Sequence, residues 1–314
     1  MAKKPLGIIL YRGPSMLDGM PIMVIAPLEN STNDKTGDMI PTYIIKTTIS
    51  PIMSMTDKAR KSNYYSDYSV CGDCKQRDFG SCYVNYGQAP EQVFGAFHRD
   101  GYVSYTPDML KYFENKDIRL GSYGEPAAVP IEVWDTICGV ASGYTGYTHQ
   151  WNNPDIDSNL KKYCMASCDT TKEYFKAKEQ GWRTFRVRLP LTSTLNKFGW
   201  FPKFVLLEQL TLDNEKICPA SKEAGMSSNC AKCKACMGLS ADTNKDVCIT
   251  IHGTDVKIKK FIDGIKCIIN KKGWRKEFSI KDRKRVPVVK VAKKRKKRKK
   301  RKITLKIIKK REVA

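Results

Sequence analysis

The sequence predicts an α/β protein whose strands and helices build a (β/α) barrel-like sheet, complete or incomplete. Two observations lead to this prediction. Segments with the pattern of strands alternate with segments with the pattern of helices between residues 117 and 253, which is typical of a parallel sheet, open or closed into a barrel. The chain has 314 residues, of which 41% are hydrophobic, so it can bury the core of one large α/β domain or of two smaller ones.

Composition divides the chain into four regions. They are a strand-rich lead-in, an α/β body with two cysteine clusters, a basic extension and a disordered tail rich in Lys and Arg: residues 1–60, 61–253, 254–280 and 281–314. Within the lead-in, the apolar stretches 21–28 and 42–49 flank the polar loop 30–39. Apolar, β-branched stretches around a loop of Asn, Asp and Gly predict a hairpin of two strands.

The elements of the body follow from periodicity and from capping residues. Pro130 occupies a first helical position, and Trp134 and Cys138 follow at helical spacing. Asp169 and Thr170 are cap residues at the start of another helix. Such patterns predict helices over four ranges: 90–99, 130–142, 158–163 and 171–181. Strands are predicted over six ranges: 117–126, 143–151, 164–170, 184–189, 203–210 and 247–253.

Polar side chains stand where several of these strands end. Active sites of parallel α/β folds lie at this edge of the sheet, because the loops that follow the strands meet there. We therefore treat five residues as candidate catalytic residues that line a cleft: Glu125, His149, Asp169, Arg186 and His252. Ordinary capping and ion pairing explain any one of them more simply, so the pattern predicts a cleft and names no reaction.

The first group of cysteines has the spacing C-x2-C-x7-C: Cys71, Cys74 and Cys82. A C-x2-C loop turns two sulfurs toward one metal, and Gly72 eases the tight turn between them. A fourth ligand must come from elsewhere in the chain. Cys164 and Cys168 are the best candidates, because positions four apart on a strand share one face.

The second group has the spacing C-x11-C-x2-C-x2-C: Cys218, Cys230, Cys233 and Cys236. Three thiols in a short loop can wrap a compact cluster that a distant fourth thiol completes. The tight triple and the Cys–Pro pair are similar to the iron–sulfur run of bacterial ferredoxins, with the order reversed, whereas most zinc ribbons use two separated C-x2-C pairs. The predicted cofactor is an iron–sulfur cluster or zinc. Disulfides and buried, unligated thiols are the weaker explanations, since the chain shows no export signal.

The net charge of +24 belongs almost entirely to the C-terminal region. Residues 254–314 hold 27 Lys and Arg against five Asp and Glu, a net +22, which leaves +2 for residues 1–253. Ten consecutive cations lie in this region: Lys293, Lys294, Arg295, Lys296, Lys297, Arg298, Lys299, Lys300, Arg301 and Lys302. Such a run repels itself and is expected to be disordered. By displacing counterions from phosphates it would bind nucleic acid without sequence preference.

Several blocks of the sequence resemble an uncharacterised family of proteins from tailed phages and prophages. The blocks are RGPSMLDG (12–19), RLGSYGEPAAVP (119–130), CGDC…CYVN and CPASKEAG…CAKCKACMG. The resemblance covers about residues 7–253, and the cysteine blocks are its most specific part. It implies a phage origin and no established activity.

Three functional hypotheses follow. The first is a viral metal- or iron–sulfur-binding protein that associates with nucleic acid through its basic tail, inside the host cytoplasm. The second is a redox or nucleotide-modifying enzyme with a cleft at the carboxyl ends of the strands. The third is a non-enzymatic module that binds a host or virion protein. No apolar run approaches the length of about 18 residues that spans a membrane, so no membrane partner is expected.

Overall fold

The computed structural model of the chain describes four stretches and the backbone of two further short strands: residues 4–29, 33–54, 67–201, 206–270, 289–292 and 304–307. The ten-cation run 293–302 lies outside the described residues, so its state and its partner stay predictions. Two strands flank it, β12 (Val289–Ala292) and β13 (Thr304–Ile307), and they pair antiparallel. No helix in the described ranges is long and apolar enough to cross a bilayer.

The first sheet has six strands in the order β4-β1-β2-β3-β5-β6. Its members are β1 (Gly7–Pro14), β2 (Pro21–Pro27), β3 (Ile40–Lys46), β4 (Val103–Ser104), β5 (Asp117–Tyr123) and β6 (Gly143–Thr145). Strand β2 pairs antiparallel with β1 on one side and with β3 on the other, and the β2–β3 pair confirms the predicted hairpin. From β3 onward the sheet is parallel through β5 to β6.

The second sheet has five parallel strands in the order β10-β11-β9-β8-β7. Its members are β7 (Tyr147–Thr148), β8 (Met165–Cys168), β9 (Thr184–Arg188), β10 (Glu215–Ile217) and β11 (Asp246–Thr250). Only Gly146 separates β6 from β7, and a Cβ there would lie 2.6 Å from the sulfur of Cys164. The segment 143–148 therefore belongs to both sheets, and a glycine is needed where it passes Cys164.

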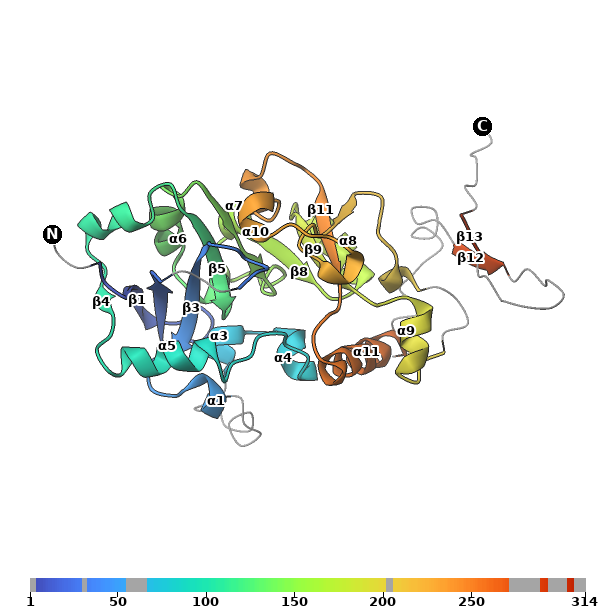
Figure 1. Cartoon of the computed structure of the whole chain (residues 1–314), viewed down its shortest axis with the longest axis horizontal. Helices are drawn as coiled ribbons and strands as arrows, with labels where there is room; N and C mark the ends of the chain where they lie inside the picture. Colours follow the sequence, from blue (N-terminus) through green and yellow to red (C-terminus); the bar gives the residue numbers. More distant parts are fainter. Residues whose placement is uncertain are drawn as a thin grey trace.

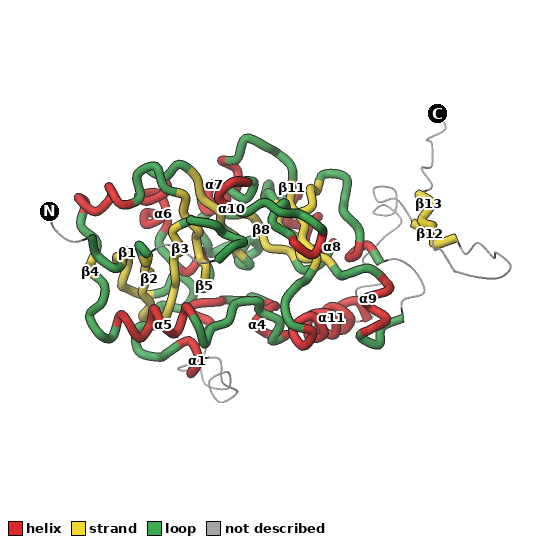
Figure 2. The backbone as a smooth tube through the Cα atoms, in the orientation of Figure 1, coloured by secondary structure: helices red, strands yellow, loops and turns green. Residues whose placement is uncertain are grey.

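The α/β class is confirmed, with helices along both sides of the sheets (Figures 1 and 2). The α-helices are α1 (Pro51–Ser54), α3 (Tyr68–Cys71), α4 (Lys75–Phe79), α5 (Ala89–Phe97), α6 (Ile131–Cys138), α7 (Leu160–Tyr163), α8 (Thr171–Glu179), α9 (Thr192–Lys197), α10 (Cys230–Cys233) and α11 (Asp255–Asn270). The four predicted helices correspond to α5, α6, α7 and α8. Strands β1 to β11 form two sheets and β12 and β13 a separate pair, and the described strands do not show a closed barrel.

One sequence prediction needs correction, and one region holds a helix that was not predicted. The predicted strand 203–210 is a 3₁₀ helix at Leu207–Gln209, and its first residues lie outside the described part of the chain. The nearby strand is β10, which has only three residues, and so short a segment carries too little alternation to be recognised. The basic extension from residue 254 holds the sixteen-residue helix α11, which is amphipathic and packs against α4.

Helix α11 belongs to the core although its segment is strongly basic. Phe261 and Ile265 are fully buried, and the ring of Phe261 meets that of Phe79 edge-on at 6.3 Å between centroids. At Gly264 an added Cβ would lie 2.5 Å from the Phe79 ring. Helix α11 therefore fixes α4, which immediately follows the first C-x2-C pair (Figure 1).

Candidate functional site

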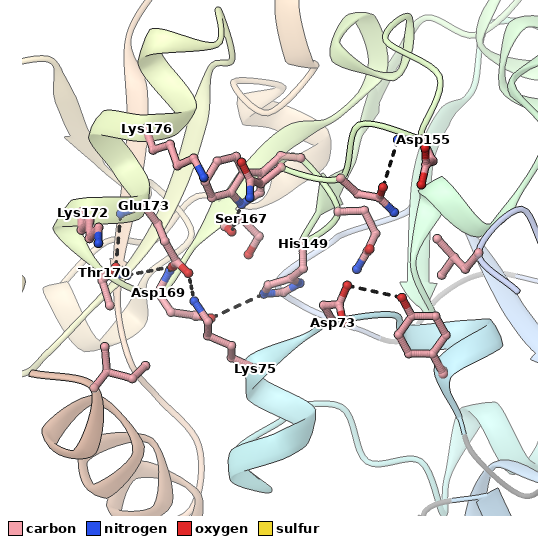
Figure 3. A pocket seen from close by; sticks show the side chains of 17 residues that line it. Asp73, Lys75, His149, Asp155, Ser167, Asp169, Thr170, Lys172, Glu173 and Lys176 are labelled. Carbon is pink, nitrogen blue, oxygen red and sulfur yellow. Dashed lines mark hydrogen bonds and ion pairs between the residues drawn. The ribbon is translucent and has the colours of Figure 1, made fainter. Parts of the chain in front are cut away.

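A cleft of about 780 Å³ opens at the carboxyl ends of β7 and β8 (Figure 3). His149 follows β7 directly, and Ser167 and Asp169 stand at the end of β8. Lys75 reaches the cleft from α4, and Glu173 lines it from the first turn of α8. The cleft therefore lies at the edge of the parallel sheet where the sequence predicts one.

A hydrogen bond from its backbone amide fixes the position of His149, and one nitrogen of its ring faces both a carboxylate and a thiol. Its amide donates to Oε2 of Glu125 at 2.8 Å. Its Nε2 atom lies 3.9 Å from Oδ2 of Asp169 and 3.9 Å from Sγ of Cys74. Burial raises the pKa of Glu125, which is only 4% exposed. Three of the predicted catalytic residues thus come together, and Cys74 joins them.

Asp169 is a buried carboxylate fixed by hydrogen bonds. Its Oδ1 atom accepts from Nε2 of Gln76 at 2.6 Å, and the Gln76 amide is in turn oriented by the hydroxyl of Ser81, which donates to Oε1 at 2.7 Å. The Asp169 backbone amide donates to Oε2 of Glu173 at 2.7 Å, beside the capping box that Thr170 and Glu173 form at the start of α8. The carboxylate is therefore held in one orientation, with Oδ2 toward His149.

The wall of the cleft opposite His149 is charged. Lys75 forms an ion pair with Glu173 (Figure 3). Burial lowers the pKa of Lys75, although neighbouring anions oppose this. Lys172 and Lys176 line the same wall, and Asp155 lies across the cleft. The lining holds three lysines and four carboxylates, those of Asp73, Asp155, Asp169 and Glu173, and such a mixed lining suits a small polar ligand with hydrogen-bonding groups.

The first cysteine group flanks the short helices α3 and α4 next to this cleft: Cys71 ends α3, Cys74 is the N-cap residue of α4, and Cys82 follows α4. Burial raises the pKa of Cys74 to about 12 and that of Cys82 to about 11, and it raises the pKa of Cys71 well above its ordinary value. Cys74, if ionised, also raises the pKa of Cys71 and of Cys82, and Cys82 raises that of Cys71, so the three sulfurs lie within range of one another's charge. Gly72 has φ 51°, and a Cβ there would lie 2.3 Å from the Gln150 amide.

One small cavity of about 10 Å³ is lined by all four members of the second cysteine group: Cys218, Cys230, Cys233 and Cys236. Tyr147 of β7 forms another part of the wall. All twelve cysteines of the chain are free thiols. Within the described ranges, no three or more His, Cys, Asp or Glu side chains are arranged as a ready metal-binding group.

Cys168, a candidate fourth ligand of the first group, lies at the end of β8. Its thiol donates to the carbonyl of Ala166 at 3.6 Å, and its charged neighbours are Asp169, Arg186 and Lys75. The other candidate, Cys164, is fully buried against Gly146. Cys164 directly precedes β8 and Cys168 is its last residue, so both thiols lie in the buried region of the sheet next to the cleft.

Of the five residues predicted to line the cleft, His149 and Asp169 do so. Glu125, Arg186 and His252 are not among the lining residues, and Glu125 accepts a hydrogen bond from the backbone amide of His149. Arg186 is fully buried and binds Glu215 through two hydrogen bonds of 2.7 and 2.6 Å, which link β9 to β10. His252 follows β11, and its Nε2 atom lies 2.9 Å from Nζ of Lys35. Burial lowers the pKa of His252, and the Lys35 charge adds to this effect.

Sequence reasoning did not single out Lys75 and Gln76, which shape the cleft. Both directly follow the C-x2-C pair, Lys75 in the cleft wall and Gln76 against Asp169. Their position next to a predicted metal loop is the signal that could have found them.

Comparison with known proteins adds nothing to this geometry: no protein-family model matches the sequence, and no curated protein or solved structure matches the chain. The function is therefore argued from the site itself.

Proposed function

We propose that this protein is a metal-dependent enzyme that acts on a small polar ligand bound in the cleft at the ends of β7 and β8. In this proposal the metal is an iron–sulfur centre held by the first cysteine group: Cys71, Cys74 and Cys82. The observation that carries the proposal is the distance of 3.9 Å between Sγ of Cys74 and Nε2 of His149. That contact joins a group of three neighbouring thiols to a residue of the cleft wall.

Three thiolates leave a metal centre with a position that no cysteine occupies. Catalytic metal sites keep such an open position for water or substrate, whereas structural sites close it with a fourth protein ligand. His149 and Asp169 lie on the side of Cys74 that faces the cleft. Without metal, the high pKa values keep the three thiols protonated, so metal binding releases protons.

The cleft suits a nucleotide or a ligand of similar size and charge. Its volume of about 780 Å³ is within the usual range of small-molecule sites, roughly 300–1,000 Å³. Lys75, Lys172 and Lys176 gather in its wall among four carboxylates, and in this proposal they are the cations that bind a phosphate while the carboxylates accept from the rest of the ligand. His149 and Asp169 are placed to move a proton at the ligand. In the same proposal the two sheets act as one incomplete barrel, joined at residues 143–148.

The setting of the enzyme is also part of the proposal. The resemblance of the sequence blocks supports a phage origin, and the ten-cation run supports contact with nucleic acid. Twelve free thiols suit the reducing interior of a host cell.

Anaerobic purification followed by iron, acid-labile sulfide and zinc analysis tests the proposal. We expect iron and sulfide in the wild-type protein, with visible absorbance from thiolate-to-iron charge transfer, and their loss in Cys74→Ser. Cys267→Ser is the matched control, because Cys267 is exposed on α11. A wild-type protein free of iron, or a Cys74→Ser variant that keeps it, would overturn the proposal.

A further inference from the structure

The second cysteine group surrounds a cavity of its own, separate from the cleft. Cys218 follows β10, Cys230 and Cys233 stand at the two ends of α10, and Cys236 lies three residues further along. The cavity they line measures about 10 Å³. That is room for about one water-sized sphere. Four thiols from two separate segments therefore border a space of the size of a single ion.

Hydrogen bonds that involve no sulfur hold this loop in place. The guanidinium of Arg183 donates to the carbonyl of Gly238 at 2.7 Å and to that of Ala235 at 2.9 Å. The amide of Cys230 donates to the carbonyl of Lys35 at 2.9 Å. At the start of α10 the side chain of Asn229 accepts from the Lys232 amide at 3.0 Å. The backbone positions of the thiols are thus set before any ligand is bound.

Two cations lie close enough to balance thiolate charge. Arg119 and Lys35 are the two cations that act electrostatically on the sulfur of Cys230. Arg119 is buried, with its guanidinium 4.3 Å from the centre of the Tyr147 ring and one nitrogen donating to Thr145 at 3.2 Å. A divalent ion with four thiolates carries two net negative charges, and two nearby cations offset them.

We propose that Cys218, Cys230, Cys233 and Cys236 bind one Zn²⁺ ion in a closed four-thiolate site. The ferredoxin-like spacing favours an iron–sulfur cluster, whereas the cavity between the four sulfurs, at about 10 Å³, has the size of one ion, and analysis of iron and sulfide distinguishes the two. As described, the sulfurs border the cavity without forming a ready metal-binding group. Binding therefore draws them inward to the Zn–S distance of about 2.3 Å.

A closed site of this kind stabilises structure and takes no part in catalysis at the metal. It would tie the loop 218–236 to β7, because Tyr147 shares the cavity wall. This site is independent of the first cysteine group, so it goes beyond the proposed enzyme function and can stand or fail without it.

Metal analysis of the full chain tests the inference. We expect one zinc per chain in the wild-type protein, its loss in Cys233→Ser, and its retention in Cys74→Ser and Cys267→Ser. Because Cys233→Ser can unfold the loop, a second measurement uses the wild-type chain: zinc is removed with a chelator and replaced by Co²⁺. The Co²⁺ form should then show the strong visible bands of a tetrahedral thiolate site.

Three outcomes would overturn the zinc site: wild-type protein without zinc, zinc lost equally in Cys74→Ser, or iron lost from Cys233→Ser in place of zinc. Loss of iron in Cys74→Ser concerns the proposed enzyme function alone, so the two proposals are distinguishable.

Discussion

Replacing Glu215 by Gln tests whether Arg186 serves the fold and not the chemistry. Arg186 donates through Nε and Nη2 to the two carboxylate oxygens of Glu215 at 2.7 and 2.6 Å, and both side chains are 0% exposed. The same Nη2 donates to the carbonyl of Leu210 at 2.6 Å. Glu215→Gln leaves a buried guanidinium without its counter-charge. Breaking a buried pair in this way costs about 3–5 kcal/mol of unfolding free energy.

Urea denaturation followed by tryptophan fluorescence measures this loss. The control is the double variant Arg186→Met with Glu215→Leu, which removes both charges and keeps apolar volume. Apolar replacement of a whole buried pair is often neutral or stabilising, so the double variant should recover most of the loss. A loss below about 1 kcal/mol in Glu215→Gln, as for a surface pair, would refute the reasoning, and so would an equal loss in both variants.

Three further predictions concern the cleft, a histidine and the tail. Lys75→Ala should weaken the binding of nucleoside 5′-monophosphates by about tenfold or more in calorimetry, since a charge-assisted hydrogen bond contributes about 1.5–3 kcal/mol. Lys197→Ala, exposed and paired with Asp255, should leave that binding unchanged, and an equal effect of both would contradict the cleft assignment. The pKa of His252 is lowered in the folded protein, so in acid the unfolded chain binds more protons than the folded chain. The stability that neutral His252 contributes is therefore full above the ordinary histidine pKa and is lost as the pH falls below that value. His252→Gln should therefore flatten the acid limb of a urea-unfolding pH profile, and an unchanged profile counts against this. Removing residues 281–314 should abolish retention on DNA at low salt with metal content unchanged, whereas retention by the shortened chain would place the binding surface elsewhere.

The strand-end rule predicted part of the site because parallel strands bring their carboxyl ends to one edge. Glu125, His149 and Asp169 each follow a strand of the parallel region, and all three meet. Arg186 lies within β9, where its side chain reaches across to β10. A pattern along the sequence indicates where a strand ends but not which other strands its side chains can reach in the sheet. The partner Glu215, on β10, could therefore not be predicted.

The sequence predicted helices where apolar residues recur at helical spacing among few charges, and it missed a helix where many lysines stand between the apolar residues. Helix α11 carries its buried residues at helical spacing: Phe261, Ile262, Ile265 and Ile269. The many lysines among them make the segment read as a solvated extension, although their charge lies on the opposite face. Cys74 was predicted as a metal ligand, which stays a prediction, and its contact with His149 joins residues 75 positions apart, so no local pattern in the sequence indicates that contact.

Strand β7 and the histidine that follows it connect the two proposed metal sites. Tyr147 forms part of the wall of the second cysteine cavity, and His149 forms part of the wall of the cleft. Two residues of extended backbone, about 7 Å, separate them. The short strand β7 and the residue after it thus border both the cavity and the cleft. If an ion binds between the four thiols, any shift of Tyr147 would be carried along this segment to His149, so the two sites would share one piece of backbone although they share no ligand.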